Sequence, residues 1–574
     1  MRKTAARLTV RALENIGVRY TFGIPGVHNI ELYDELNRSK LIHPVLVTHE
    51  MAAAFMADAI SRTTDSIGTL AVVPAAGLTH AMSGIGEAWL DGIAMLVISG
   101  GVRTDIDKGY QLHELDQHEL LKPLTKATYK ITSNDTVTEQ IHQAWLTAIS
   151  DEPGPVYVEL PANLQLKADD PGPSSQPPEK PTPRVADADA IEQAVALLGA
   201  AKRPGIFAGW GAAGARAGLI DLAERLGAPV ATTLQGLSVF PANHPLHTGM
   251  GMGQAAVPAA ENAFADCDCL LAIGVRFSEI PTGSYGISPP KNLIHLDINP
   301  AVFNRNYPAA VTLHGDAAAT IDQLLKRLPE TRSDASALAA RIDRDKTTYL
   351  DEWLAHDSAD RVNPAIFFKS LRDQLQDDAI VVADDGNHTF LAAELMPIYG
   401  DRGFLSPSDF NSMGYCVPAV NACKLAHPDR QVVGIVGDGA FLMSGMETLT
   451  ARTLDLGSIY FIFNDGELSQ IAQAQEIPYN RKTCTVLKNP DFKLFAAACG
   501  AEFVRIQNNT EVDSGISAAL AVALANRPVI VDVHIDYSKR TRFTKGVVKT
   551  NLKRFGTRDK LRIVSRALAR KITG

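Results

Sequence analysis

The 574-residue chain has few of the features that mark membrane proteins or disulfide-stabilised proteins. It has no run of about 18 apolar residues, so we expect no membrane-spanning helix. Six cysteines are too few for a disulfide framework, and Cys267 and Cys269 have no second pair at zinc-binding spacing. Arg7, Arg11 and Glu14 interrupt the N-terminal segment, so we expect no signal peptide. These absences favour a protein of the reducing cytoplasm.

The composition is typical of folded soluble domains, with 46% apolar and 21% charged residues. The length predicts three or four domains at about 150 residues each. Residues 171–184 contain six prolines, which exclude a helix or a central strand and indicate an extended linker. We expect an N-terminal domain over 1–165, the linker over 166–187, a central domain over 188–330, a helical connection over 331–363, a C-terminal domain over 364–537 and a basic tail over 538–574.

Short β-branched runs alternate with helical periodicity in each of the three predicted domains, as at residues 68–73, 204–209 and 432–437. Continuous apolar strands separated by helices are typical of parallel sheets that are covered on both faces. We therefore predict an α/β fold of three doubly wound parallel-sheet domains. In such sheets ligands bind at the carboxyl ends of the strands.

Two strand ends in the C-terminal domain carry oxygen ligands. One strand ends in Gly-Asp-Gly-Ala at 437–440, and a second ends in Asn-Asp-Gly at 464–466. If the strands are neighbours, Asp438 and Asn464 lie side by side, and their oxygens suit Mg²⁺ or Ca²⁺. Glycines let a diphosphate approach the backbone closely. Two ordinary Gly/Asp turns are the alternative, although the pairing of the two motifs disfavours it.

This pair of motifs resembles the thiamine-diphosphate motif, with Phe463 in place of its usual first Asn. The resemblance implies that Asp438, Asn464 and the carbonyl of Gly466 hold Mg²⁺ on the diphosphate. Met413 would be the apolar wedge that bends the cofactor. The expected cofactor contacts are Pro25, Gly26, Gly386, Asn387, His388, Thr389, Asn411, Met413, Gly437, Gly439, Ala440, Glu467 and Leu468.

Glu50 opens a helix of small residues, and residues 45–62 resemble the same family's His-Glu segment. A glutamate at a helix start is by itself explained by the helix dipole. The resemblance instead implies that Glu50 activates the cofactor by protonating its aminopyrimidine ring. It also implies that Glu50 and the metal site, in different domains, are paired across a subunit interface, which makes the protein a homodimer or homotetramer.

The branch of the family is indicated by residues 22–36, 247–256, 272–279 and 464–481, which resemble acetolactate synthases. This implies decarboxylation of a pyruvate-like 2-oxo acid, followed by joining of the acyl group to a second carbonyl compound to form an acyloin. His28, His80 and His113 fall where the family builds the substrate space, and imidazoles there could move protons. Many acetolactate synthases lack a histidine at position 28. Benzaldehyde lyase and some decarboxylases of guanidino 2-oxo acids have one, so simple decarboxylation or hydroxyketone cleavage stays open.

The central domain contains a Gly-x-Gly-x-x-Gly match at Gly209, Gly211 and Gly214, without an acidic ribose partner at the expected distance. Because some branches of the family bind FAD here, FAD is a candidate third cofactor. A FAD-dependent 2-oxo acid oxidase at a membrane surface is a further alternative.

The tail carries thirteen basic residues and one acid, Asp559, a net charge of +12 against −21 for the rest of the chain. An apolar stripe is predicted on one helical face, formed by Leu561, Val564, Leu568 and Ile572. Such a helix can pack on an acidic subunit, close over the site or bind an anionic membrane peripherally. We expect packing or a lid. We expect no nucleic-acid binding, because aromatic platforms are missing.

Overall fold

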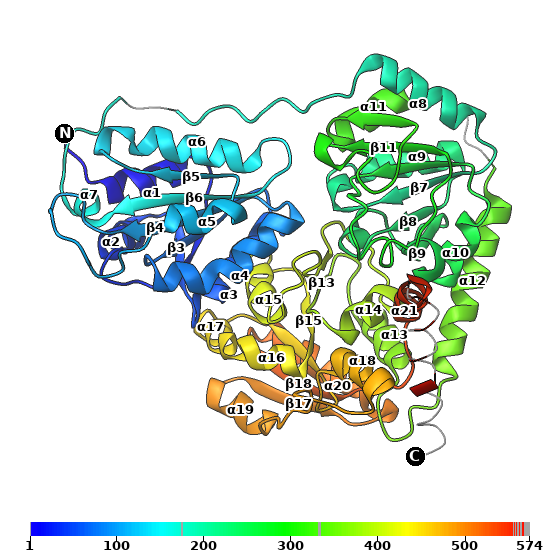
Figure 1. Ribbon diagram of the computed structural model, residues 1–574. Helices are drawn as coiled ribbons and strands as arrows, with labels where there is room; N and C mark the ends of the chain where they lie inside the picture. The colour runs from blue at the N-terminus through cyan, green and yellow to red at the C-terminus, as the bar shows by residue number, and fades with distance from the viewer. Residues whose placement is uncertain are drawn as a thin grey trace. The chain divides into compact units, whose positions relative to one another are not determined.

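The computed structural model describes residues 2–173, 176–330 and 334–554, together with 556, 558, 562, 565 and 566. Among these residues the strands form three sheets of six strands with flanking helices, and every strand pair is parallel (Figure 1). The predicted α/β fold with three doubly wound domains is confirmed. The predicted apolar stripe of the tail, Leu561, Val564, Leu568 and Ile572, lies outside the described residues.

The first sheet has the strand order β2-β1-β3-β4-β6-β5. Its strands are β1 (Tyr20–Gly23), β2 (His43–Leu46), β3 (Gly68–Val72), β4 (Met95–Gly101), β5 (Ala127–Lys130) and β6 (Pro155–Pro161). The accompanying helices are α1 (Ala5–Asn15), α2 (Ile30–Arg38), α3 (Glu50–Thr63), α4 (Ala76–Asp91), α5 (Gln117–Leu121), α6 (Val137–Ile149) and α7 (Ala162–Leu166), with short 3-10 turns η1 (Lys122–Leu124) and η2 (Asn134–Thr136). Small residues bring α3 and α4 together, because a Cβ on Gly84 would lie 2.4 Å from the Cβ of Ala54.

The second sheet has the order β12-β11-β10-β7-β8-β9. Its strands are β7 (Pro204–Ala208), β8 (Val230–Thr232), β9 (His247–Met250), β10 (Cys269–Ile273), β11 (Asn292–Asp297) and β12 (Val311–His314). Its helices are α8 (Ala188–Ala200), α9 (Arg216–Leu226), α10 (Pro258–Phe264) and α11 (Ala317–Leu325), with turns η3 (Trp210–Ala212), η4 (Gln235–Ser238), η5 (Gly253–Ala255) and η6 (Pro300–Val302). The long helix α12 (Ser336–Leu354) follows within the predicted helical connection.

The third sheet has the order β14-β13-β15-β16-β18-β17. Its strands are β13 (Ile380–Ala383), β14 (Phe404–Leu405), β15 (Val432–Gly437), β16 (Ile459–Asn464), β17 (Glu502–Ile506) and β18 (Val529–His534). Its helices are α13 (Pro364–Gln374), α14 (Asn387–Leu395), α15 (Cys416–Ala426), α16 (Asp438–Ser444), α17 (Thr448–Thr453), α18 (Ser469–Tyr479), α19 (Phe492–Cys499), α20 (Val512–Leu524) and α21 (Arg542–Arg554), with turns η7 (Gly445–Glu447) and η8 (Asn509–Glu511).

The chain forms two compact units, and the division does not follow chain order. The first unit contains residues 1–182, 410–429 and 444–458, and the second contains 183–409, 430–443 and 459–574. The segment 410–429 belongs to the first unit because it packs on α3 and α4. There the hydroxyl of Tyr415 donates to Asp58, 2.6 Å away, and Arg62 joins Asp58 to Asp91 with contacts of 2.6 and 2.7 Å.

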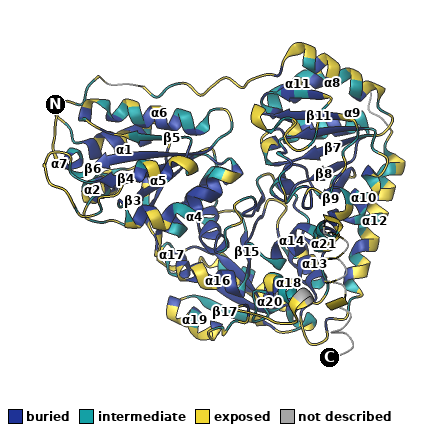
Figure 2. Ribbon diagram, in the orientation of Figure 1, coloured by how far each residue is buried: buried dark blue, intermediate teal, exposed yellow. Residues whose placement is uncertain are grey.

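The sheets are buried and the outward faces of their helices are exposed (Figure 2). The beginning of the basic tail forms α21, which belongs to the second unit and packs on α14. Its Phe543 stacks on Phe390 with ring centroids 4.2 Å apart, and the amides of Arg542 and Phe543 donate to the Glu394 carboxylate. No helix in the described part of the chain has the length and apolar character needed to cross a membrane.

Candidate active site

The third sheet reverses its strand order at β13, which lies between β14 and β15. The segments that leave β13 and β15 therefore diverge, and a ligand can bind between them. Residues 386–389 follow β13, and Asp438 follows β15. This is the region in which the sequence predicts diphosphate and metal contacts.

Asp438 is 1% exposed, and its carboxylate accepts three hydrogen bonds within the second unit. Its Oδ1 accepts from the Gly439 amide at 2.8 Å. Its Oδ2 accepts from the Gly466 amide at 2.8 Å and from Asn489 Nδ2 at 2.7 Å. Burial raises the pKa of Asp438, and these donors partly offset the shift. A buried carboxylate with several donors is held in a defined orientation.

Asn464 is oriented by a carboxylate from the neighbouring strand β18. Its Nδ2 donates to Asp532 Oδ1 at 2.8 Å, and Asp532 is only 2% exposed. This contact leaves Oδ1 of Asn464 to face Asn489, whose Nδ2 lies 3.0 Å away. Asn489 Nδ2 therefore bridges the two predicted metal ligands, Asp438 and Asn464. The sequence reasoning missed both Asn489 and Asp532.

The predicted diphosphate loop after β13 is built around a neutral histidine. Burial lowers the pKa of His388 to about 3, so its ring is uncharged. Its Nε2 accepts from the Gly437 amide at 3.3 Å. Gly386 has φ 149°, and a Cβ there would lie 2.7 Å from the His388 ring. Both glycines leave room for this imidazole between β13 and β15.

The remaining predicted contacts of the second unit line the same strand ends. A Cβ on Gly439 would lie 2.3 Å from the Leu468 side chain, so these two residues are in close contact. Glu467 pairs with Lys482 at 2.8 Å. Thr389 donates to the Asp384 carbonyl. Asn387 is half-buried, and Ala440 is buried.

In the first unit, Glu50 is the first residue of α3 and is 7% exposed. Its Oε2 lies 3.0 Å from Nδ1 of His80, which stacks on His49 with ring centroids 4.7 Å apart. Gly77 leaves room for the carboxylate, since a Cβ there would lie 2.9 Å from Glu50 Oε1. The structure thus brings together Glu50 and His80, two residues singled out from the sequence.

The segment before Glu50 is anchored by Glu447, which the sequence reasoning missed. Glu447 is 1% exposed and accepts from the amide and the hydroxyl of Thr48, at 2.9 and 2.5 Å. Burial raises the pKa of Glu447, and the hydrogen bonds from Thr450 and Thr48 oppose the shift. This buried carboxylate fixes the backbone that enters α3.

His28 and His113 form a second pair in the first unit, with ring centroids 5.1 Å apart. The Nδ1 atom of each ring is buried without a hydrogen-bond partner. Burial is the main cause that lowers the pKa of His28, and the nearby His113 lowers it further. His113 has φ 65°, an unusual backbone conformation for a non-glycine residue. The two rings that the sequence proposes as proton carriers therefore lie together.

The other predicted contacts of the first unit lie in its loops. Gly26 follows Pro25, and its amide donates to Asn29 Oδ1 at 2.7 Å. Asn411 has φ 63° and is exposed, whereas Met413 is half-buried. The intervening Ser412 amide donates to Glu87 Oε2 at 3.1 Å, which attaches this segment to α4.

Comparison with known proteins identifies the family of these domains. Residues 3–120 match the N-terminal binding domain of thiamine pyrophosphate enzymes, residues 191–324 the central domain and residues 384–533 the C-terminal binding domain. The chain is 32% identical to a probable acetolactate synthase large subunit of Methanocaldococcus jannaschii, covering 92% of both chains. The chain belongs to the thiamine pyrophosphate enzymes. It is a thiamine-diphosphate-dependent enzyme of the acetolactate synthase-like family, as the resemblance predicted.

Two other relatives of this family show the range of its members. The large subunit of acetolactate synthase isozyme 3 from Escherichia coli is 31% identical, covering 93% of this chain and 95% of the relative. A probable 2-ketoarginine decarboxylase from Pseudomonas aeruginosa is 32% identical, covering 90% of this chain and 91% of the relative. Relatives of both kinds therefore align with nearly the whole chain.

The oxygens of Asp438 and Asn464 fit the metal ion that a thiamine pyrophosphate enzyme places on its diphosphate. Both approach one point, now held by the Asn489 amide nitrogen, at 2.7 and 3.0 Å. The carbonyl of Gly466, the third predicted ligand, accepts from the Leu487 amide at 2.8 Å and keeps a second lone pair. Among the described residues, no group of three or more His, Cys, Asp or Glu could hold a metal ion, so a carboxylate-amide-carbonyl set is the alternative.

The glycine loop of the central domain does not fit a flavin diphosphate. The Gly209 amide donates to the Ile273 carbonyl at 2.9 Å, and the Gly211 amide donates to the Gly274 carbonyl at 3.3 Å. A Cβ on Gly209 would lie 2.2 Å from the Gly274 carbonyl oxygen. The first two glycines therefore allow the loop to pack against the end of β10, and the amides of Gly209 and Gly211 are already used.

Proposed function

We propose that the protein decarboxylates a 2-oxo acid of the pyruvate class and joins the remaining acyl group to a second carbonyl compound, giving an acyloin. The observation that carries the proposal is the convergence of Asp438 and Asn464 on one point at the end of the third sheet. A buried Glu50 at the end of the first sheet and acetolactate synthase relatives that cover more than 90% of the chain support it.

The side chains divide the work between binding and proton handling. When bound, thiamine diphosphate supplies the electron sink that a 2-oxo acid needs as carbon dioxide leaves. Asp438 and Asn464 would hold Mg²⁺ and thereby neutralise the diphosphate. Glu50 would hold a proton at the cofactor's aminopyrimidine ring, and His80, 3.0 Å from it, positions its carboxylate. His28 and His113 would carry protons to and from the substrate oxygen.

Release of a free aldehyde is the second candidate function, favoured by the His28–His113 pair. Decarboxylation to an aldehyde requires delivery of a proton to the acyl carbon, whereas acyloin formation requires that proton to be withheld. Two adjacent imidazoles with buried, unpartnered Nδ1 atoms suit proton delivery. The 2-ketoarginine decarboxylase relative is consistent with this alternative.

The two functions are separated by supplying [2-¹³C]pyruvate with thiamine diphosphate and Mg²⁺ and recording ¹³C spectra. Acyloin formation bonds two labelled carbons to each other, so the product shows one-bond ¹³C–¹³C coupling. A free aldehyde shows none. A guanidino 2-oxo acid is assayed in parallel, and an absorption spectrum reports any bound flavin. Aldehyde as the sole product from every 2-oxo acid tested would overturn the proposal in favour of the decarboxylase.

We also propose a homo-oligomer in which Glu50 of one copy acts with the metal site of another. The support is that Glu50 and Asp438 belong to different compact units, together with the pairing known for the family. Co-expression of Glu50→Gln and Asp438→Ala chains tests this idea. In a mixed dimer one of the two sites would keep both residues, so a purified mixed dimer should have about half of the wild-type activity. Random pairing makes about half of the dimers mixed, so the co-expressed mixture should have about a quarter. Recovery of no activity in purified mixed dimers would contradict the pairing.

A further inference from the structure

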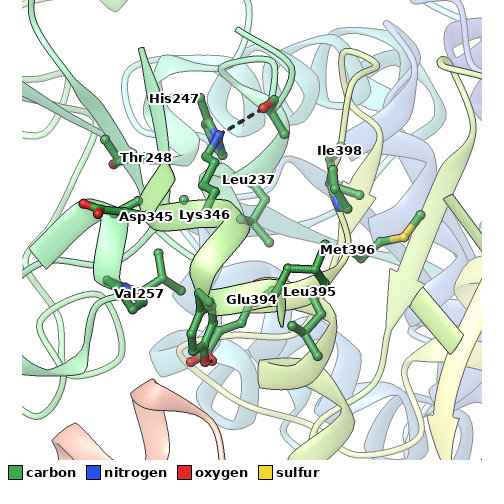
Figure 3. A pocket seen from close by; sticks show the side chains of 18 of the residues that line it. Leu237, His247, Thr248, Val257, Asp345, Lys346, Glu394, Leu395, Met396 and Ile398 are labelled. Carbon is green, nitrogen blue, oxygen red and sulfur yellow. Dashed lines mark hydrogen bonds between the residues drawn. The ribbon is translucent and has the colours of Figure 1, made fainter. Parts of the chain in front are cut away.

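A cavity of about 200 Å³ lies in the second unit, apart from the residues assigned to the cofactor. It is bordered by β9, by α12 and by the C-terminal end of α14 with the segment after it (Figure 3). The predicted diphosphate loop is at the other end of α14, about 13 Å away for a helix of nine residues. The thiamine site therefore does not account for this cavity.

One side of the cavity carries a buried lysine, Lys346; burial lowers its pKa and the Asp343 carboxylate raises it, but the two residues form no ion pair. Lys346 Nζ donates to the Ala242 carbonyl at 3.3 Å and to His247 Nδ1 at 3.3 Å. No carboxylate among the described residues forms an ion pair with Lys346, and Asp345 points away from it (Figure 3). Burial lowers the pKa of Lys346 to about 8, as expected for a desolvated cation.

His247 adds a second hydrogen-bond donor. Burial is the main cause that lowers the pKa of His247 well below its usual value, and the adjacent Lys346 lowers it further. The ring is therefore neutral. Because Nδ1 accepts from Lys346, the ring hydrogen is on Nε2, and Nε2 is buried without a partner. The Lys346–His247 pair thus keeps one ammonium hydrogen and one buried ring hydrogen without a partner, and it offers no free acceptor, which favours a carboxylate over a neutral group.

The rest of the lining is largely apolar. It includes Leu237, Val257, Leu395, Met396 and Ile398. Two acids, Asp345 and Glu394, belong to the lining. Asp345 accepts from Asn262 Nδ2 at 2.9 Å, and the Glu394 oxygens accept from the Tyr349 hydroxyl and from the start of α21. An apolar cavity of ~150 Å³ is large enough to bind benzene, so this one can hold a ring or branched chain with a carboxylate.

We infer that this cavity binds a small monocarboxylate with an aromatic or branched apolar body, its carboxylate on Lys346 and His247. The ligand is held at the opposite end of α14 from the diphosphate loop. The site is therefore separate from the substrate site. A neutral ligand of the same shape leaves the lysine unpaired and binds more weakly.

The test uses 4-fluorobenzoate as the probe and ¹⁹F NMR of the full-length protein. We expect a dissociation constant of roughly 0.1–1 mM, in line with about ten non-hydrogen atoms. The amide 4-fluorobenzamide should bind at least about 10-fold more weakly, because it lacks the charge. The variant Lys346→Met should lose binding by a similar factor while remaining folded, since it replaces a desolvated cation with an apolar chain.

Two further variants separate this site from other sources of binding. Lys369→Met removes an exposed lysine that pairs with Asp373, and it should bind the probe like the wild type. Glu50→Gln should also bind normally, which excludes the substrate site as the source. The inference is overturned if Lys346→Met, folded by circular dichroism, binds the probe as well as the wild type, if the amide binds equally well, or if no binding is detected at about 10 mM.

Discussion

The first and third sheets share one strand order, in which the first strand of each lies between the second and the third. Their loops carry different chemistry. The loops of the first sheet present a carboxylate and imidazoles, Glu50, His80 and the His28–His113 pair. Those of the third present oxygen ligands and glycines around Asp438. The same topology thus supports proton transfer in one domain and anion and metal binding in the other, because function resides in the loop residues and not in the fold.

The largest expected effect comes from removing the acid of the first sheet. Glu50→Gln should lower kcat about 10²- to 10⁴-fold, because a general acid-base group contributes that much. Cofactor affinity should change little, since the third sheet holds the diphosphate. Steady-state kinetics and calorimetric titration of thiamine diphosphate measure the two quantities. Glu119→Gln, at the exposed start of α5, is the matched control with normal activity. Full activity in Glu50→Gln would contradict the assignment of proton transfer to Glu50.

The helix that carries Glu50, α3, is held by buried ion pairs between Arg62 and the carboxylates of Asp58 and Asp91. The contacts of Asp438 include no such ion pair. Arg62→Met leaves Asp58 and Asp91 buried without their cation, and both are fully covered. We expect local destabilisation of about 3–5 kcal/mol. Hydrogen exchange should speed up in α3 peptides and stay unchanged in β15 and β16. Arg38→Met breaks only exposed pairs and should cost about 0–1 kcal/mol. Equal protection of α3 in both variants would show that the buried ion pairs do not support the site.

The third site should be sensitive to the carboxylate that orients Asn464. Asp532→Asn removes the charge that holds the Asn464 amide nitrogen at 2.8 Å, so the amide can turn its oxygen away. We expect the Mg²⁺ affinity, titrated calorimetrically with thiamine diphosphate present, to fall about 10- to 100-fold. The exposed Asp373→Asn is the control. An unchanged Mg²⁺ affinity in Asp532→Asn would mean that Asp532 has only a structural role.

The smallest expected effect concerns the turn before α4. Ala75 has φ 52° and ψ −89°, a conformation that favours glycine. Ala75→Gly should stabilise the protein by about 0.5–1 kcal/mol, since relief of strain exceeds the added entropy of the unfolded chain. Ala88→Gly, in the middle of α4, should destabilise it by about 1 kcal/mol. Thermal melts compare the two, and destabilisation by both would refute strain at Ala75.

Sequence patterns predicted most of the fold where strands are fully buried. Continuous apolar runs indicated β3, β7, β15 and β16, because both faces of these strands are covered. Edge strands such as β5 and β17 are largely half-buried, so their sequences carry polar residues and gave no comparable signal. Residues 410–429 belong to the first unit because of buried contacts such as the one between Tyr415 and Asp58. These two residues are far apart in the sequence, so local sequence patterns could not predict the contact.

The sequence, through the resemblance of its motifs to a known family, predicted the family, the thiamine-diphosphate dependence and the candidates Glu50, Asp438 and Asn464. The tertiary structure decided which residues orient them: Asp532 and Asn489 in the second unit, and His80 and Glu447 in the first. It also brought Lys346 to His247, 99 positions away in the chain. The motif residues could be predicted because a motif consists of residues at fixed spacing in the sequence. The partners of a buried polar group are chosen by packing, which brings distant residues within hydrogen-bonding range.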